Sequence, residues 1–207
     1  MTIRVAIVDD HPVVLGGLDA ALATIADLDV VAHGANLSEG RVIAERPDVD
    51  VILLDVRLPD GNGLELVSEV AQRGRPAVIM LSSFKTKQYV AAALRFGAQG
   101  FLLKTAPLTE LIAAIRSVAA GGSTFSAEQL REARSGYVNL TLRERQILRL
   151  VLRGRSNEEI GAELQVSHKT VEAHLSKLYE RLGIMSRIEL ALQAEHEGWL
   201  DIGSSSA

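Results

Sequence analysis

The sequence predicts a mixed α/β protein, in which a five-stranded parallel sheet covered by helices is followed by a small all-helical domain. Three observations indicate this. Across residues 1–120, short apolar runs rich in β-branched residues alternate with longer segments whose apolar residues recur at helical spacing. Residues 121–139 break the alternation with paired glycines, serines and charged residues. From residue 140 onward only helical spacing remains.

Each expected strand of the first domain is followed by an expected helix. The strands are expected at Ile3–Val8, Leu28–His33, Val51–Leu54, Ala77–Leu81 and Gly100–Leu103. The helices are expected at Val13–Ile25, Ser38–Arg46, Gly63–Gln72, Lys87–Phe96 and Leu108–Ala120. Successive strand–helix units place the strands in parallel with helices on both faces, which is the flavodoxin-like arrangement.

The C-terminal domain contains clear helix boundaries. Thr141 and Glu144 form a capping box that starts a helix running to about Arg153. Ser156 then caps a second helix over residues 157–164, and a third helix starts at about Ser167. The third helix has a buried stripe at helical spacing, formed by Val171, Leu175, Leu178 and Leu182. The chain therefore divides into a sheet domain (1–120), a linker with room for one short helix (121–139), a helical domain (140–200) and a flexible tail (201–207).

Composition sets limits on the function. A chain of 207 residues can form two modest cores, and the absence of cysteine excludes disulfides, thiolate metal sites and cysteine nucleophiles. No stretch approaches the roughly 18 uninterrupted apolar residues of a membrane span, so no membrane association is expected and the expected location is the cytoplasm. The net charge of -4 gives no indication of nucleic-acid binding, which must be argued from local pattern.

Three aspartates fall at the expected carboxyl ends of strands. Asp9 and Asp10 directly follow the first strand, and Asp55 directly follows the third. Because the sites of doubly wound sheets gather at this edge, the three acids are expected to become neighbours. Packed carboxylates repel one another unless some are protonated or a cation lies between them, and oxygen ligands of this kind suit Mg²⁺. The sequence therefore predicts a magnesium site here.

A hydroxyl and an ammonium group are expected at the same edge, because Ser82 follows the fourth strand and Lys104 the fifth. A carboxylate can attack phosphorus to form an acyl phosphate, while a metal ion and a lysine neutralise charge on the transferring oxygens. Taken alone, any one of these two residues and the three aspartates is equally well explained as a solvated turn residue. Because all five are expected at strand ends on the same edge of the sheet, together they favour a site that handles a phosphoryl group.

These residues lie in stretches that resemble the receiver domain of two-component response regulators, namely VDDHP, LLDVRLPDGNGLEL, VIMLSS and GAQGFLLK. The resemblance spans the whole first domain. It implies that Asp55 is the phosphoacceptor and that Asp9 and Asp10 join it in binding magnesium. It also implies a metal-binding backbone carbonyl at Val56 or Arg57, and the family pattern favours Arg57.

The same resemblance assigns the switch residues. It makes Ser82 the switch hydroxyl, Lys104 the lysine that pairs with the phosphoryl group, and Phe101 the aromatic residue that changes rotamer on phosphorylation. A new dianionic group near the serine and lysine would make charge-assisted hydrogen bonds and bias a two-state surface. One departure from the family pattern is Thr105, since the proline that commonly follows the lysine is absent.

The third helix of the C-terminal domain carries small and polar residues opposite its apolar stripe. Charge alone gives weak support for DNA binding, because residues 141–191 contain nine Lys or Arg against seven Asp or Glu. The motifs are more informative: LTLRERQILRLV, SNEEIGAELQVSHKTVEAHLSKLYERLGI and SRIELAL resemble the LuxR/NarL-type helix-turn-helix domain. A receiver followed by this domain is the arrangement of the NarL/FixJ subfamily of response regulators.

That resemblance implies the DNA contacts. It places three residues opposite the base edges: Glu172, Ala173 and Ser176. It makes five others phosphate contacts: Lys169, Thr170, His174, Lys177 and Arg187. Phosphate contacts supply affinity, whereas base contacts supply sequence choice, and a glutamate can accept a hydrogen bond from a cytosine amino group. The simpler explanation of these residues is a solvated helix face with ordinary ion pairs.

The remaining histidines and the last helix complete the interpretation. His11, His33 and His196 show no metal-ligand spacing and are expected to be ordinary turn or surface residues. The last helix, expected at Ile188–Trp199, carries more apolar surface than a three-helix core needs, so a dimer contact is expected there. A dimer on two half-sites would gain both affinity and specificity.

The sequence thus predicts a response regulator that accepts a phosphoryl group on Asp55 from a sensor histidine kinase and controls transcription as a DNA-bound dimer. No enzymatic activity is expected beyond its own phosphotransfer and dephosphorylation. Three alternatives remain. One is a DNA-binding regulator that is independent of phosphorylation. Another is a module whose helices bind RNA or a protein partner. The last is an aspartyl-phosphate phosphohydrolase, although such enzymes usually carry a second aspartate where Arg57 stands.

Overall fold

The computed structural model describes residues 2–83, 86–136 and 138–200, which form two separate units. The first unit contains the described residues up to Gly136, and the helical unit runs from Val138 to Leu200. The expected tail at 201–207 lies outside the described residues. Each unit has its own apolar core.

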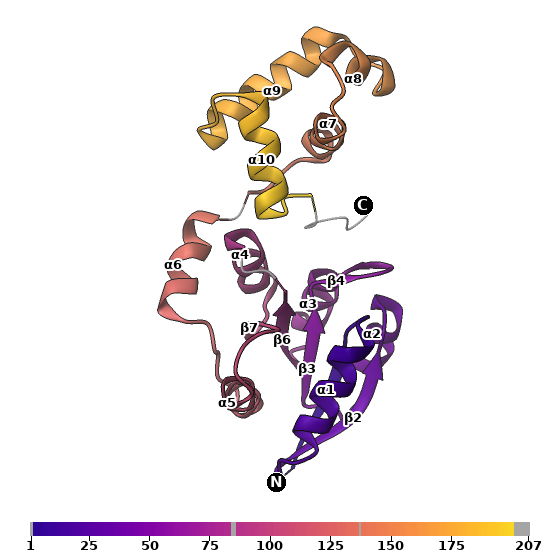
Figure 1. Cartoon of the computed structure of the whole chain (residues 1–207), viewed down its shortest axis with the longest axis vertical. Helices are drawn as coiled ribbons and strands as arrows, with labels where there is room; N and C mark the ends of the chain where they lie inside the picture. Colours follow the sequence, from indigo (N-terminus) through magenta and orange to yellow (C-terminus); the bar gives the residue numbers. More distant parts are fainter. Residues whose placement is uncertain (1, 84–85, 137, 201–207) are drawn as a thin grey trace. The chain divides into compact units, whose positions relative to one another are not determined.

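The first unit is built on five parallel strands (Figure 1). They are β1 (Ile3–Val8), β2 (Leu28–Gly34), β3 (Val51–Asp55), β6 (Ala77–Ser82) and β7 (Gly100–Leu103). Their order across the sheet is β2-β1-β3-β6-β7. The chain builds outward from β1 in one direction and then from β3 in the other, so the strand order reverses between β1 and β3. The predicted flavodoxin-like α/β architecture is confirmed.

Helices cover both faces of this sheet because alternate residues of each strand point to opposite sides. In β1, Val5 and Ile7 pack on one face, whereas Ala6 and Val8 pack on the other. The first face is covered by α1 (Pro12–Leu22) and α5 (Leu108–Ala119). The second face is covered by α2 (Leu37–Ala44), α3 (Gly63–Ala71) and α4 (Lys87–Phe96).

The stretch expected to be a linker is attached to the first unit over much of its length. The backbone N–H of Thr124 donates to Gln99 O at 2.8 Å, and Gln129 Nε2 donates to Phe101 O at 2.9 Å. Phe125 is buried in the same core as Phe101. These contacts lead into α6 (Ala127–Gly136), which packs against α4 (Figure 1). The packing of the first unit therefore extends beyond the expected boundary at residue 120.

A short antiparallel pair of strands, which the sequence did not predict, connects β3 to α3. It consists of β4 (Arg57–Leu58) and β5 (Gly61–Asn62). The following Gly63 N–H donates to Val56 O at 2.9 Å. A Cβ atom at Gly63 would overlap the backbone carbonyl oxygen of Asp55. Only glycine allows this close approach, so Gly63 fixes the path of the chain directly after Asp55.

The helical unit contains α7 (Leu142–Leu152), α8 (Asn157–Glu163), α9 (His168–Leu182) and α10 (Arg187–Glu197). Both predicted capping residues, Thr141 and Ser156, form capping boxes, and Ser167 caps α9. The predicted stripe on α9 is buried at Val171, Leu175 and Leu178, while Leu182 is partly buried. In the part of the chain that the structure describes, no helix has the length and apolar character needed to span a membrane.

We predict that Gly63→Ala lowers the free energy of unfolding of the first unit by about 2 kcal/mol, because the added methyl group meets fixed backbone. The matched control is Gly17→Ala in α1, where a Cβ meets nothing within 4 Å. This control should raise stability by up to about 1 kcal/mol through helix propensity.

Urea unfolding followed by far-UV circular dichroism measures both changes. The fluorescence of Trp199, the only tryptophan and a buried residue of the helical unit, should report an unchanged transition. Equal effects of the two substitutions would contradict the steric explanation.

Candidate functional site

Two aspartates meet at the carboxyl edge of the sheet. Asp9 directly follows β1 and Asp55 is the last residue of β3, and these strands are neighbours in parallel register. Their side chains are almost completely buried, with 1% and 6% of their surface exposed, whereas Asp10 beside them is 36% exposed. The predicted clustering of these acids at the switch point is what the structure shows.

Lys104 holds the two buried carboxylates together. It follows β7, and its Nζ lies 2.7 Å from Asp9 Oδ2 and 2.8 Å from Asp55 Oδ2. Its backbone N–H donates to Ser82 O at 2.8 Å, so the lysine is anchored to the neighbouring strand β6. The ammonium therefore reaches from the outer strand of the sheet, past β6, to the ends of β1 and β3.

Burial and charge act in opposite directions on these groups. Burial is the largest influence on Asp55 and raises its pKa above the ordinary value of 3.8, although Lys104 opposes it. For Lys104, burial would lower the pKa, but the hydrogen bonds and charges of Asp55 and Asp9 outweigh it and the pKa is raised. The lysine is therefore cationic at neutral pH, and the carboxylate of Asp55 is held close to a positive charge.

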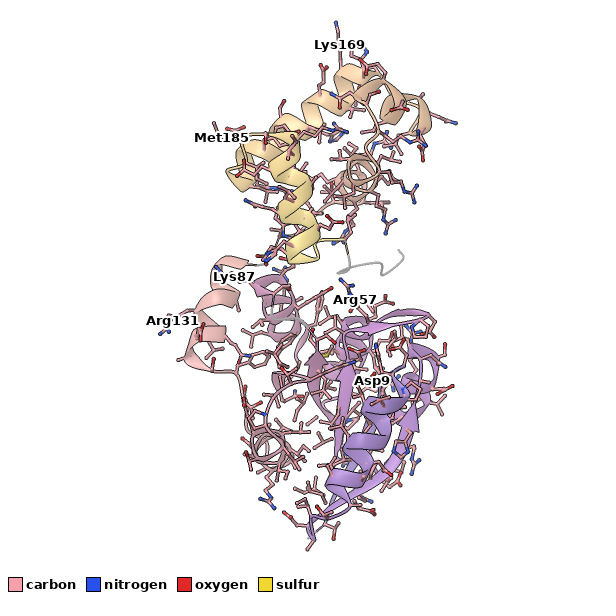
Figure 2. All side chains as sticks on the ribbon, viewed as in Figure 1. Asp9, Arg57, Lys87, Arg131, Lys169 and Met185 are labelled. Carbon is pink, nitrogen blue, oxygen red and sulfur yellow. The ribbon has the colours of Figure 1, made fainter. Side chains whose placement is uncertain are left out.

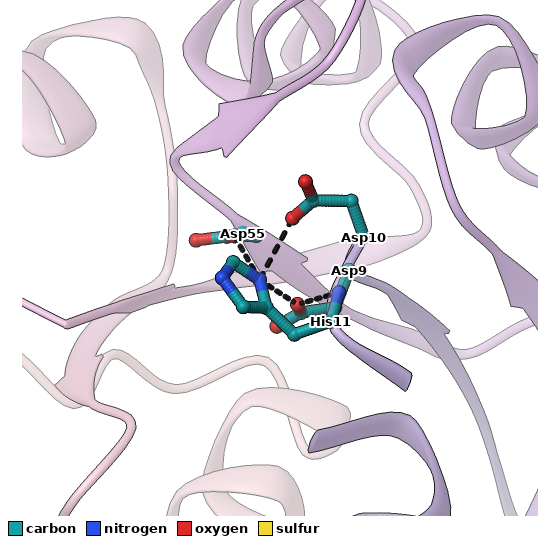
Figure 3. Close-up of side chains that lie close together, drawn as sticks. All are labelled: Asp9, Asp10, His11 and Asp55. Carbon is teal, nitrogen blue, oxygen red and sulfur yellow. Dashed lines mark hydrogen bonds and ion pairs between the residues drawn. The ribbon is translucent and has the colours of Figure 1, made fainter. Parts of the chain in front are cut away.

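His11 is a residue of this site that the sequence interpretation missed. Expected to be an ordinary turn residue, it instead directs its Nδ1 among the acids (Figure 3). The Nδ1 atom lies 2.8 Å from Asp10 Oδ1, 3.0 Å from Asp9 Oδ1 and 3.8 Å from Asp55 Oδ2. One ligand atom from each of these four residues lies within 4.8 Å of all the others. The donor set is compatible with a divalent cation. The available signal was the position of the histidine, directly after two acids at a strand end.

The other predicted receiver residues lie on β6, on β7 and in β4, just after β3. Ser82 ends β6 and is buried, and Phe101 lies fully buried in β7. Arg57 is exposed, and its Nε donates to the hydroxyl of Tyr89 at 3.1 Å. The carbonyl of Val56 accepts the N–H of Gly63, and the expected metal-binding role of the Arg57 carbonyl stays a prediction.

The predicted DNA-contacting residues lie together on the outward face of α9. Lys169, whose side chain extends away from the helical unit (Figure 2), belongs to this face. The other exposed members are Thr170, Glu172, Ala173, Ser176 and Lys177, and His174 is partly buried. Arg187 differs, because its guanidinium donates to Asn157 Oδ1 at 2.9 Å and to the carbonyl of Arg155. It connects the start of α10 to α8, so its phosphate contact stays a prediction.

The turn between α8 and α9 depends on the backbone conformation of Gln165 and on the absence of a side chain at Gly161. Gln165 has a φ of 55°, in the left-handed region, and Val166 N–H donates to Gly161 O at 2.9 Å. A Cβ at Gly161 would lie 2.7 Å from Val166 O. This close approach sets α9 against α8 in a helix-turn-helix arrangement.

The opposite electrostatic environments of Asp55 and Asp60 predict opposite pH dependence. Because the pKa of folded Asp55 is raised, its protonated form favours folding, and stability falls as pH rises from 3.8 through the raised pKa. Asp55→Asn should therefore be more stable than the parent chain at neutral pH in a chelator, and the difference should shrink below the ordinary pKa.

Asp60 provides the matched control. Desolvation would raise its pKa, but hydrogen bonds from Leu37 N, Ser38 N and Ser38 Oγ outweigh it and lower the pKa. The charged carboxylate of Asp60 contributes to folding stability above its ordinary pKa, and this contribution is lost as the pH falls through the lowered pKa of the folded state. Asp60→Asn should therefore be less stable than the parent chain at neutral pH. Urea unfolding across this pH range measures both variants, and shifts of the same sign would contradict the assignment.

Comparison with known proteins agrees with this geometry. Residues 5–116 match the response regulator receiver domain, and residues 138–194 match the bacterial regulatory proteins of the luxR family. The chain is 38% identical to the transcriptional regulatory protein UhpA of Escherichia coli strain K12, over 95% of this chain and 100% of UhpA. It is 32% identical to the transcriptional regulatory protein DesR of Bacillus subtilis strain 168, over 95% of this chain and 98% of DesR.

Among solved structures, the two-component response regulator RcsB in complex with DNA is similar over 95% of this chain and 99% of RcsB, with a TM-score of 0.65 and 25% identity. The sheet with its acidic cluster, the helix-turn-helix that follows it and these full-length matches lead to one conclusion. The chain belongs to the NarL/FixJ-type two-component response regulators, with a receiver domain and a LuxR-type DNA-binding domain.

Proposed function

We propose that this response regulator accepts a phosphoryl group on Asp55 from a sensor histidine kinase in the cytoplasm, and that phosphorylation controls transcription through sequence-specific binding of a dimer to a DNA operator. One observation carries the proposal. The ammonium of Lys104 bridges the buried carboxylates of Asp55 and Asp9, in a chain that also presents a helix-turn-helix. Beyond its own phosphotransfer and dephosphorylation, no further activity is proposed.

Mg²⁺ fits the donor set, which consists of carboxylate oxygens and one backbone carbonyl. Asp9, Asp10 and Asp55 would hold it, and the resemblance to receiver domains adds the carbonyl of Arg57. When bound, the cation neutralises charge on the oxygens of the transferring phosphoryl group. A bound cation would also reduce the repulsion among the three carboxylates.

The residues of the chain perform the transfer by position and charge. One oxygen of Asp55 attacks the phosphorus as the P–N bond to the kinase histidine breaks, and the departing imidazole keeps the electron pair and takes up a proton. Lys104 is already within 2.8 Å of Asp55, so its ammonium can move from the carboxylate to a phosphoryl oxygen. The transfer thus replaces the ion pair between Lys104 and the Asp55 carboxylate with an ion pair between Lys104 and the phosphoryl group.

A path leads from this site toward the DNA-binding half of the chain. Ser82 and Phe101 are the proposed switch residues, and Phe101 O is bound by the side chain of Gln129 at 2.9 Å. Gln129 lies in α6, which precedes the helical unit in the chain. A shift of the β7 backbone on phosphorylation therefore reaches the connecting segment through a direct hydrogen bond.

DNA binding is proposed for the exposed face of α9. Lys169, Thr170, His174 and Lys177 can contact phosphates, while Glu172, Ala173 and Ser176 face the bases. The RcsB–DNA complex supports binding of this domain type to duplex DNA. Glu172 repels phosphates and can accept from a cytosine amino group, so it supports discrimination more than affinity.

Dimer formation is proposed for an exposed apolar stripe at α10. Met185, Ile188 and Leu192 are 90%, 73% and 62% exposed and recur at helical spacing. Leu190 and Ala194 of the same helix are buried in the core of their own unit, so they do not add to this stripe. A second copy packing on the stripe would cover side chains that are otherwise in water.

We predict that the chain takes up one phosphoryl group from a small acyl phosphate in the presence of Mg²⁺, and that Asp55→Asn takes up none. The matched control Asp60→Asn keeps the uptake. Mass spectrometry detects the group, and its removal by hydroxylamine identifies an acyl phosphate. On a duplex selected from random DNA, phosphorylation should tighten binding by about tenfold in the parent chain and have no effect on Asp55→Asn.

Each alternative gives a different result in the same experiment. Donor-stimulated DNA binding by Asp55→Asn would contradict the switch. Phosphorylation without any change in DNA affinity would favour the phosphorylation-independent regulator. Repeated release of phosphate from small phosphate esters would favour the phosphohydrolase, and preference for RNA over duplex DNA would favour the RNA-binding module.

We further predict that Lys169→Ala weakens binding to all duplex sequences alike. The plot of log affinity against log salt concentration has a negative slope, and the loss of one phosphate contact should make this slope less steep by about 1. Lys87→Ala, which removes an exposed lysine of the first unit, is the matched control and should leave the slope unchanged. Fluorescence anisotropy at several salt concentrations measures both. A change in sequence preference without a change in slope would show that Lys169 reads bases instead.

A further inference from the structure

We propose that His11 is a ligand of the cation site, so that the site accepts first-row transition-metal ions of the Mn²⁺, Co²⁺ and Zn²⁺ class through one nitrogen as well as Mg²⁺ through oxygens alone. The proposal rests on the divalent-cation site of the proposed function. It adds a fourth side chain to the three acids and changes the class of ion that the site prefers.

The distances place His11 among the ligands and not behind them. Two ligands at right angles around one ion, each about 2.1 Å from it, lie about 3 Å apart. The Nδ1 atom of His11 lies 2.8 Å from Asp10 Oδ1 and 3.0 Å from Asp9 Oδ1. Its distance of 3.8 Å from Asp55 Oδ2 lies between the adjacent and opposite positions of such a site. A single ion can therefore be shared by all four residues (Figure 3).

The backbone holds His11 in this position before any ion binds. Pro12 starts α1, and the residue before a proline is restricted to extended conformations. His11 has φ of -95° and ψ of 107°, and its N–H donates to Asp9 Oδ1 at 2.9 Å. Because the starting point of the side chain is fixed by its neighbours, little conformational freedom remains to be lost on metal binding.

The chemistry of the ring completes the argument. Imidazole suits Zn²⁺ and its neighbours, whereas Mg²⁺ prefers oxygen ligands and keeps several waters. Coordination by Nδ1 places the ring proton on Nε2, and the half-exposed ring, at 59%, can direct Nε2 to solvent. In contrast, His33 pairs with one carboxylate, that of Asp19 at 3.1 Å, and belongs to no such cluster among the described residues.

Pulsed electron paramagnetic resonance of the full chain loaded with Mn²⁺ provides a direct test, because a nitrogen bound to the ion modulates the electron spin echo. The parent chain, without a histidine tag, should show this modulation. It should disappear in His11→Ala and in His11→Asn, which keeps a polar side chain at the N-cap position of α1, where His11 makes no side-chain capping hydrogen bond. His33→Ala is the matched control and should retain it.

Isothermal titration calorimetry gives the second readout. Removal of His11 should lower the affinity for Co²⁺ and Zn²⁺ by at least about tenfold and change the affinity for Mg²⁺ by less than about threefold. Unchanged nitrogen modulation in His11→Ala, or equal losses for Mg²⁺ and Co²⁺, would overturn the assignment of His11 and leave the proposed function in place. Failure of the parent chain to bind any divalent ion would overturn both.

Discussion

The ion pair of Lys104 with Asp9 and Asp55 is the interaction on which the functional half of the first unit depends. Two buried carboxylates at the ends of adjacent strands repel each other and lose hydration. The ammonium at 2.7 and 2.8 Å from them opposes both effects, although burial remains the larger influence on Asp55. Because the lysine comes from the outermost strand β7, the acids at the ends of β1 and β3 are electrostatically linked to the edge of the sheet. Any change of charge at Asp55 therefore changes the electrostatic interaction with Lys104 at the end of β7.

Much of the fold could be predicted because its signals are local. The strands β1, β3, β6 and β7 are largely buried on both faces, so they appear in the sequence as short apolar runs, and the helices of the second unit start at side chains that cap them. The attachment of residues 124–136 to the first unit could not be predicted in the same way. One aromatic residue, Phe125, and one glutamine side chain make contacts with strands and helices far away in the chain, and neither creates a repeating pattern.

The residues of the candidate site also divide into those that a sequence pattern reveals and those that it does not. Asp9, Asp10, Asp55 and Lys104 could be placed together because a doubly wound sheet brings the ends of its parallel strands to one edge. His11 was missed although it directly follows two acids at a strand end, because only the orientation of its ring brings Nδ1 among them. The importance of Gly63 could not be predicted, because it depends on a close approach of backbone atoms to which residue type alone does not point. Arg187 likewise has the charge of a phosphate contact but is held against α8 by its neighbours.

The segment from Thr124 to Gln129 has a consequence beyond signalling. The strand β7 stands at one border of the sheet, where backbone amide and carbonyl groups would otherwise be open to pairing with another chain. The bonds from this segment to the carbonyls of Gln99 and Phe101 occupy part of that border. A polypeptide that stopped at residue 120 would leave the border uncovered and an aromatic cavity in the core, and such a fragment would tend to join its sheet to that of another molecule.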